Sequence, residues 1–240
     1  MIKHFFITLL FLSFLTTGFA QSKVYLIPTL HGLHKTNSQY TYGSLQAIIG
    51  KIKPDVIAVE MRAEDVASDT SYLKKNYPYE MWMAGYWFAS SVIEGFDWLG
   101  NDLEGKPIPG RYWKDQSRIK ALERLLDGDS LYSTRLSRCQ TYVDERMNIL
   151  KNNSLKNILR SSDAILTKVY YDCMNLQLQG SDYAELTNFY AERNKKMQER
   201  LSAIIKKYPG KTIVVLTGDD HYPYLMEYLR KQNVVLAKPY

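Results

Sequence analysis

Three short apolar runs stand out in the pattern of hydrophobic and polar positions. They are VYLI at 24–27, VIAV at 56–59 and IVVL at 213–216. Runs of Val, Ile and Leu without alternating polar residues are typical of strands in a parallel sheet that helices cover on both faces. The segment YGSLQAIIGKI between the first two runs has its apolar residues at helical spacing. This order predicts a strand–helix–strand unit with two parallel strands.

The rest of the chain divides into an aromatic stretch, a long helical part and a last strand. The stretch 77–113 holds all the tryptophans and several turn signals, and we expect it to be loop-rich. From about 117 to 207 the periodicity is helical almost throughout, with apolar stripes in 119–126 and 155–176. The run VVLA at 234–237 predicts the final strand. The fold class is therefore α/β: a small, mainly parallel sheet formed by the two ends of the chain, with a large helical insertion at about 115–207.

The N-terminus has the pattern of a secretory signal peptide at 1–20. Lys3 precedes an apolar run that ends with the small residues Gly18 and Ala20. The run has about 15 apolar residues, fewer than the ~20 that a spanning helix needs. We expect cleavage near Ala20, no stable membrane span afterwards, and a secreted or periplasmic protein whose 21–240 form a single domain.

Composition and charge restrict the partners. The hydrophobic fraction of 45% supports an ordinary core, and the net charge of +6 comes from Lys and Arg that are interleaved with acidic residues. The chain has no basic cluster with periodic aromatics, so we expect no nucleic-acid partner. A small-molecule or peptide substrate is the partner that remains.

The cysteines are Cys139 and Cys173, both in segments that read as helix. In an oxidising compartment they are compatible with one disulfide between two helices. Two buried free thiols are an equally good interpretation. The spacing matches no metal-binding motif.

Polar residues follow each of the three main runs at the point where the strand should end. His31 follows the first, Glu60 and Arg62 follow the second, and Asp220 and His221 follow the third. If the strands are parallel, all these side chains emerge at the carboxyl edge of the sheet, where open α/β sheets bind ligands. The pattern predicts one shared site.

The helical part adds Arg193 and Asn194. Both lie on the apolar stripe of their segment, between Tyr190 and Met197. A buried arginine is costly unless it is paired. We therefore expect Arg193 to contact a carboxylate, either that of Glu60 or that of a bound ligand.

These residues resemble the motifs of the TraB/Tiki group within the erythromycin-esterase and ChaN-like superfamily. The family's Gly-Thr-x-His after a strand is matched by PTLH at 28–31, with Pro28 in place of glycine. KPDVIAVEMR at 53–62 matches the next motif, Arg193-Asn194 the helical Arg-Asn, and GDDH at 218–221 the final Gly-x-x-His. Asp97 is the candidate for the family's central acidic residue. The resemblance covers about 20–65 and 185–240.

The residues and the resemblance together lead to a functional expectation. His31, Glu60 and His221 are the candidate ligands of a divalent ion (Mn, Co or Zn) with an open position for water, and Arg193 would stabilise an oxyanion. Without metal, one histidine would act as general base and Glu60 would orient it.

We expect a peptide or ester hydrolase in which Arg62, Asn194 and Asp220 help to bind the ligand. The alternative is a protein that binds haem or a peptide at the same site without turnover. In that case the aromatic stretch 77–113 would line the ligand pocket.

Overall fold

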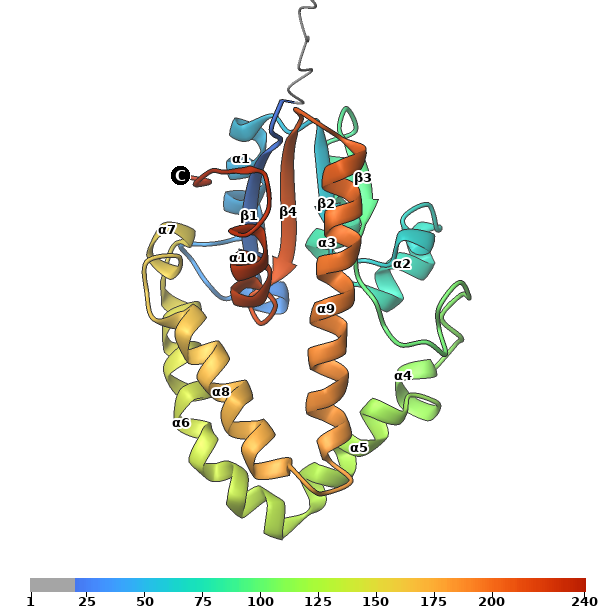
Figure 1. Cartoon of the computed structure of the whole chain (residues 1–240), viewed down its shortest axis with the longest axis vertical. Coiled ribbons are helices and arrows are strands. Elements are labelled where there is room, and N and C mark those ends of the chain that lie inside the picture. The colour runs from blue at the N-terminus through green and yellow to red at the C-terminus, as the bar shows by residue number, and fades with distance from the viewer. Residues whose placement is uncertain (1–19) are drawn as a thin grey trace, which may run out of the picture.

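The computed structural model describes residues 20–240, so the predicted signal peptide lies outside the described residues apart from Ala20. Its centre is a parallel five-stranded sheet in the order β3-β2-β4-β1-β5. The strands are β1 (Lys23–Thr29), β2 (Val56–Val59), β3 (Val92–Gly95), β4 (Thr212–Gly218) and β5 (Val235–Leu236). β4, from the end of the chain, lies between β1 and β2 (Figure 1). The predicted α/β class, with a sheet built from both ends of the chain, is confirmed.

Helices cover both faces of the sheet, which explains why the strands are apolar throughout. Val24 and Leu26 of β1 belong to a core with one set of helices, and Ile27 belongs to the core on the opposite face. The helices on the first face are α9 (Ala184–Lys207) and α10 (Tyr222–Leu229), and those on the second are α1 (Tyr42–Ile52) and α3 (Tyr79–Trp87). Both faces of the central strands β2 and β4 are shielded from water, so these strands show no alternation.

The aromatic stretch 77–113 is more regular than the sequence predicted. It contains α3, β3 and the short helix α4 (Tyr112–Asp115), after α2 (Thr70–Asn76). β3 has four residues and adds to the edge of the sheet beside β2, and a strand this short has almost no periodicity. α3 has aromatic and apolar residues around most of its circumference, so its sequence lacks a helical stripe.

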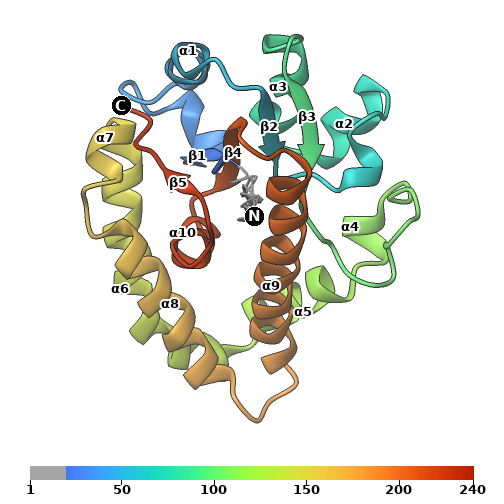
Figure 2. The same cartoon turned by 45° about the horizontal axis from the view of Figure 1, so that its top comes forward.

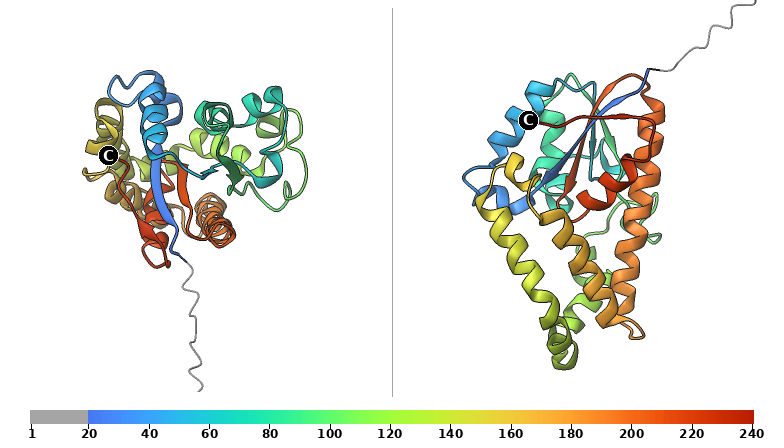
Figure 3. Two further views of the ribbon diagram at one scale, coloured as in Figure 1. Left: turned by 90° about the horizontal axis from the view of Figure 1, so that it is seen from above. Right: turned by 60° about the vertical axis from the view of Figure 1, so that its left-hand side comes forward.

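The helical insertion extends beyond the carboxyl edge of the sheet, and its last helix, α9, runs back alongside the sheet (Figures 1 and 2). Its helices are α5 (Arg118–Gly128), α6 (Ser130–Asn152), α7 (Leu155–Ile158), α8 (Asp163–Leu178) and α9. α6 and α8 lie side by side in every view (Figure 3). Short 3₁₀ helices cover His31–Lys35 and Ala63–Asp65. None of the helices within 20–240 is long and apolar enough to cross a membrane.

Part of the predicted apolar striping in the insertion is wrong. Leu122 and Leu126 are buried, but Leu125, Ile165 and Leu176 are 60%, 67% and 69% exposed. α8 packs on α6 with a face that includes the buried polar Thr167, and its apolar residues at those positions face outward. Periodicity identifies an amphipathic helix, but it does not show which face another element covers.

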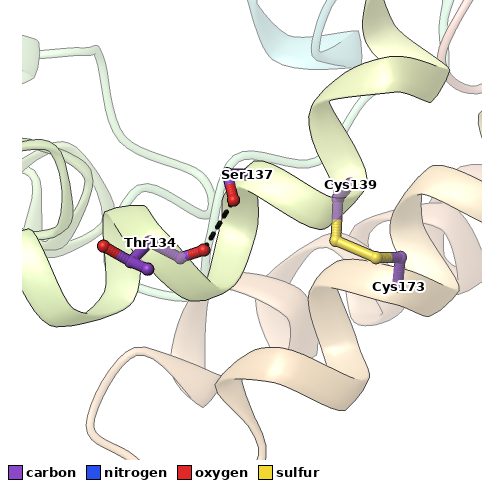
Figure 4. The surroundings of a disulfide bond; sticks show 4 residues. All are labelled: Thr134, Ser137, Cys139 and Cys173. Atoms are coloured by element: carbon purple, nitrogen blue, oxygen red, sulfur yellow. Dashed lines mark hydrogen bonds between the residues drawn. A yellow bond between two sulfur atoms is a disulfide. The ribbon is translucent and has the colours of Figure 1, made fainter.

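A disulfide joins Cys139 of α6 to Cys173 of α8 (Figure 4). Of the two interpretations left open by the sequence, the structure has the bridge and not the free thiols. Cys139 is buried, and the bridge lies midway along the two helices.

We predict that replacing both Cys139 and Cys173 by Ser lowers the stability of the insertion. The bridge closes a loop with a separation of 34 residues. Loss of such a cross-link costs about 3–4 kcal/mol in the chain-entropy account. Urea unfolding of oxidised wild type and of the double variant measures the difference. Wild type reduced with a phosphine should match the variant, and equal stability of all three would contradict the prediction.

Candidate functional site

The polar residues that follow the strands meet around one cavity at the carboxyl edge of the sheet. The parallel register aligns Thr29 with Gly218 and Val59 with Leu216, so β1, β2 and β4 end at nearly the same level. The cavity has a volume of about 220 Å³, and we call it the edge cavity. It is lined by His31, Glu60, Asn76, Tyr77, Pro78, Asp97, Leu99, Trp113, Tyr190, Arg193, Gly218, Asp219, Asp220 and His221.

Glu60 is the central carboxylate of this site, and it is buried. Its Oε2 accepts hydrogen bonds from the Thr217 hydroxyl at 2.8 Å and from the backbone N–H of Gly218 at 2.6 Å. Its Oε1 accepts from Nη2 of Arg193 at 3.0 Å. These contacts replace the water that a buried carboxylate loses, and they tie the end of β2 to β4 and α9.

Arg193 joins Glu60 to a second carboxylate, that of Asp97. Its Nε donates to Oδ1 of Asp97 at 2.8 Å and its Nη2 to Oδ2 at 3.0 Å. The arginine side chain is 16% exposed, and Asp97 is buried just beyond β3. The structure therefore pairs Arg193 with Glu60, as the apolar stripe predicted, and adds a two-pronged contact with Asp97.

His221 is held as a neutral imidazole with a defined tautomer. Nδ2 of Asn194 donates to the backbone oxygen of Tyr190, so Oδ1 of Asn194 is the atom that faces Nδ1 of His221, at 2.8 Å. The proton therefore lies on Nδ1, and the lone pair of Nε2 lies 3.6 Å from Oε1 of Glu60. Burial and the nearby charge of Arg193 lower the pKa of His221 to about 3.

His31 has the opposite charge state. Its Nδ1 lies 2.7 Å from Oε1 of Glu80, a carboxylate on α3 with no exposed surface. Burial alone would lower the pKa of His31, but the hydrogen bond to Glu80 and the charges of Glu60 and Glu80 raise it to about 9. His31 also has φ of 49°, which non-glycine residues rarely adopt and which is often found at functional sites.

Two predicted or nearby residues lie away from the cavity. Arg62 is buried against Asp65, with Nε donating to Oδ2 at 2.7 Å, and it does not line the edge cavity. His34 accepts a hydrogen bond from Leu30 N–H at Nε2 and donates from Nδ1 to the Tyr40 carbonyl. Both ring nitrogens of His34 are used, so it supports the loop before the site. Asp220 lines the edge cavity, whereas Asn194 does not line it and contacts His221 instead.

Sequence reasoning missed Glu80 and Arg146. Arg146 of α6 contacts Asp163 at 3.1 Å, Asp219 at 2.5 Å and Asp220 at 2.6 Å. It lies on the buried stripe of α6 with Cys139 and Leu150, so the reasoning applied to Arg193 would have identified it. Glu80 gave no comparable signal, because α3 itself has no periodic stripe.

The surroundings of the site do not fit a divalent ion at the predicted ligands. In metal sites, carboxylates such as those of Glu80 and Glu60 often orient the histidine ligands by accepting a hydrogen bond from them. However, both oxygens of Glu60 are already bonded, one of them to the guanidinium of Arg193, whose charge repels a cation. Within 20–240 no group of three His, Cys, Asp or Glu side chains is arranged to hold a metal ion. The metal-binding role of His31, Glu60 and His221 stays a prediction.

No family model, no curated protein and no solved structure matches this chain. The resemblance to the TraB/Tiki group therefore rests on the quoted motifs alone. The proposed function is therefore based on the geometry of the edge cavity.

We predict that His31 and His221 titrate far apart. In NMR titrations His31 should titrate near pH 9 and His221 near pH 3. Because the pKa of folded His31 lies above its ordinary value of 6.5, this group stabilises the fold below pH 6.5, and the contribution is lost as pH rises through 9. Glu80→Gln should lower the pKa of His31. Two titrations near 6.5 would contradict the assignment.

We predict that Gly218→Ala disturbs the site. A Cβ at this position would lie 2.7 Å from Nε2 of His31, so the ring would have to move away from Glu80. The NMR pKa of His31 should then fall towards its ordinary value. Gly32→Ala is the matched control, since a Cβ there meets nothing within 4 Å. An unchanged pKa of His31 in Gly218→Ala would show that the contact is tolerated.

Proposed function

We propose that the chain is a secreted or periplasmic hydrolase that cleaves a peptide or ester bond at the edge cavity. The observation that carries this proposal is the meeting of a protonated His31 and a neutral His221 beside the Glu60–Arg193 pair. Two titratable groups whose pKa values are driven apart in one cavity are suited to the roles of acid and base. Export is proposed from the pattern at 1–20.

The neutral His221 supplies the basic side of the reaction. Its Nε2 lone pair accepts a hydrogen bond from a water molecule in the cavity and takes a proton as the water oxygen attacks the substrate carbonyl. The carboxylate of Glu60, 3.6 Å away, stabilises the imidazolium that forms. Asn194 keeps the other nitrogen protonated, as the orienting carboxylate does in hydrolase triads.

The protonated His31 supplies the electrophilic side. With Nδ1 bonded to Glu80, its Nε2–H is the donor for the oxygen that becomes negative in the tetrahedral intermediate. When the C–N or C–O bond breaks, the leaving group takes the proton held by His221. Arg193 holds Glu60 and Asp97 in place throughout.

The proposed steps use only side chains of this chain, and a metal requirement has a direct test. Protein dialysed against a chelator should keep its turnover, because the Arg193–Glu60 pair occupies the place of the cation. If activity instead disappears and Mn, Co or Zn restores it, the metal-dependent form of the hydrolase is correct. In that case Arg193 must release Glu60 when the ion binds.

A second candidate is binding without turnover. The observation that favours it is a pocket of about 460 Å³ beside the edge cavity, with Trp98 and Trp113 in its wall. Of the described residues that line this pocket, none is His, Cys or Met, the commonest axial ligands of haem, so a peptide suits it better. A Soret band after haem titration, without hydrolysis of any substrate, would favour the haem form of this candidate.

We predict that His31→Ala and His221→Ala each lower hydrolysis at least about 10²-fold, because the first removes the oxyanion donor and the second removes the base. The mature chain 21–240 is assayed against fluorogenic peptides and small esters. The double variant should be little slower than either single variant, since the two groups act as a unit. Wild-type turnover in both single variants would overturn the proposal.

We predict that the two buried arginines separate function from stability. Arg193→Met should abolish turnover, because Glu60 and Asp97 lose their shared cation. Arg62→Met should lower the melting temperature and leave the turnover of the folded molecules intact, because Arg62 pairs with Asp65 outside the cavity. Thermal melts and active-site-normalised rates on both variants make the comparison. Equal loss of turnover in the two would contradict it.

A further inference from the structure

A second pocket adjoins the edge cavity and shares part of its lining, and we call it the aromatic pocket. Its main walls are Trp98, Leu99, Tyr112, Trp113, Phe189 and Tyr190, and its volume is about 460 Å³. Leu99, Trp113, Tyr190 and Arg193 line both the aromatic pocket and the edge cavity. The aromatic pocket is therefore a neighbouring site for a second group of a molecule whose reacting group lies beside His31 and His221.

The aromatic walls are fixed by their contacts with one another. Trp98 is buried and stacks on Phe189 with ring centroids 5.5 Å apart. Tyr112 and Trp113 meet edge to face at 5.0 Å, and the Tyr112 hydroxyl donates to Asp102. Trp113 and Phe189 keep part of their surface open. The pocket thus offers partly open aromatic rings in a rigid setting, to which another ring can stack.

Most charges around the aromatic pocket are already paired, with Asp102 as the exception. At the inner end Arg193 is bound to Asp97 and Glu60. At the outer rim Arg118 pairs with Glu185 at 3.2 Å, and Lys120 pairs with Glu123 at 2.6 Å. The carboxylate of Asp102 has no cationic partner among the described residues and disfavours an anionic ligand. A ligand group in this pocket gains apolar and ring contacts, which favours a neutral aromatic group. The volume lies within the range of ligand sites.

A larger pocket of about 640 Å³ lies inside the insertion, but it is a weaker candidate for the same role. It shares only Tyr190 with the edge cavity. Its charged lining residues are Glu123 and Asp127, and these carboxylates favour a cationic ligand over a neutral one. The aromatic pocket shares four lining residues with the edge cavity and has a wall of rings, so it is the stronger candidate.

We propose that the aromatic pocket is the specificity subsite, which binds an aromatic side chain adjacent to the bond that the edge cavity cleaves. This inference rests on the proposed hydrolase function for its kinetic test, but its binding test does not. The ligand class is a neutral peptide or ester with an aromatic group next to the scissile carbonyl.

The kinetic test compares N-acetyl-phenylalanine methyl ester with N-acetyl-alanine methyl ester. Wild type should prefer the phenylalanine ester at least about tenfold in kcat/KM, the usual effect of filling an apolar specificity pocket. Phe189→Ala and Trp113→Ala should each lower this ratio about tenfold. Met174→Ala, which lines only the larger pocket, is the matched control and should keep the wild-type ratio.

The binding test uses calorimetry with N-acetyl-phenylalaninamide and N-acetyl-alaninamide and requires no turnover. Wild type should bind the phenylalanine amide at least about tenfold more tightly, and Phe189→Ala should remove the difference. Preference in binding without hydrolysis of either ester sustains the subsite and rejects the hydrolase. Hydrolysis of both esters with equal kcat/KM and equal amide affinity rejects the subsite and leaves the hydrolase standing. Wild type itself decides this point even if a variant does not fold.

Discussion

The site depends on one buried carboxylate, that of Glu60. An ionised carboxylate without water or partners costs several kcal/mol in a protein interior. Here the Thr217 hydroxyl, the Gly218 N–H and the guanidinium of Arg193 together replace its water. Thr217 and Gly218 lie at the end of β4, and Arg193 lies on α9. The carboxylate therefore stabilises the fold only when β2, β4 and α9 are assembled, and the assembled elements define the cavity.

The same network sets the charges of the two histidines in opposite directions. Arg193 lies close enough to His221 to oppose a second positive charge, and burial acts in the same sense. His31 lies against Gly218 and shares a hydrogen bond with Glu80, so its positive charge is retained. Gly218 is the residue that allows this separation, since any Cβ there would collide with the His31 ring. The two histidines thus differ in charge because Arg193 lies near His221 and Glu80 lies beside His31.

The sequence predicted the parts of this arrangement that depend on strands buried on both faces. His31, Glu60 and His221 were found because each directly follows an apolar run and parallel strands end at one edge. Arg193 was found because a charged residue on an apolar stripe needs a partner. Glu80 could not be found in this way, because α3 is apolar nearly all round and shows no stripe. Arg62 was assigned to the site because its place after β2 is as good as that of Glu60, and only side-chain direction separates the two.

The insertion belongs to the site through the same kind of contact that organises Glu60. Arg146 of α6 binds Asp163 at the start of α8 and both Asp219 and Asp220 in the loop after β4. Removing this cation would leave carboxylates facing one another in a largely buried place, so the helical insertion and the His221 loop are ordered together. The disulfide between α6 and α8 then holds the two helices that carry Arg146 and Asp163. The insertion is consequently a structural support for the loop that carries His221 and, through α9, a wall of the edge cavity.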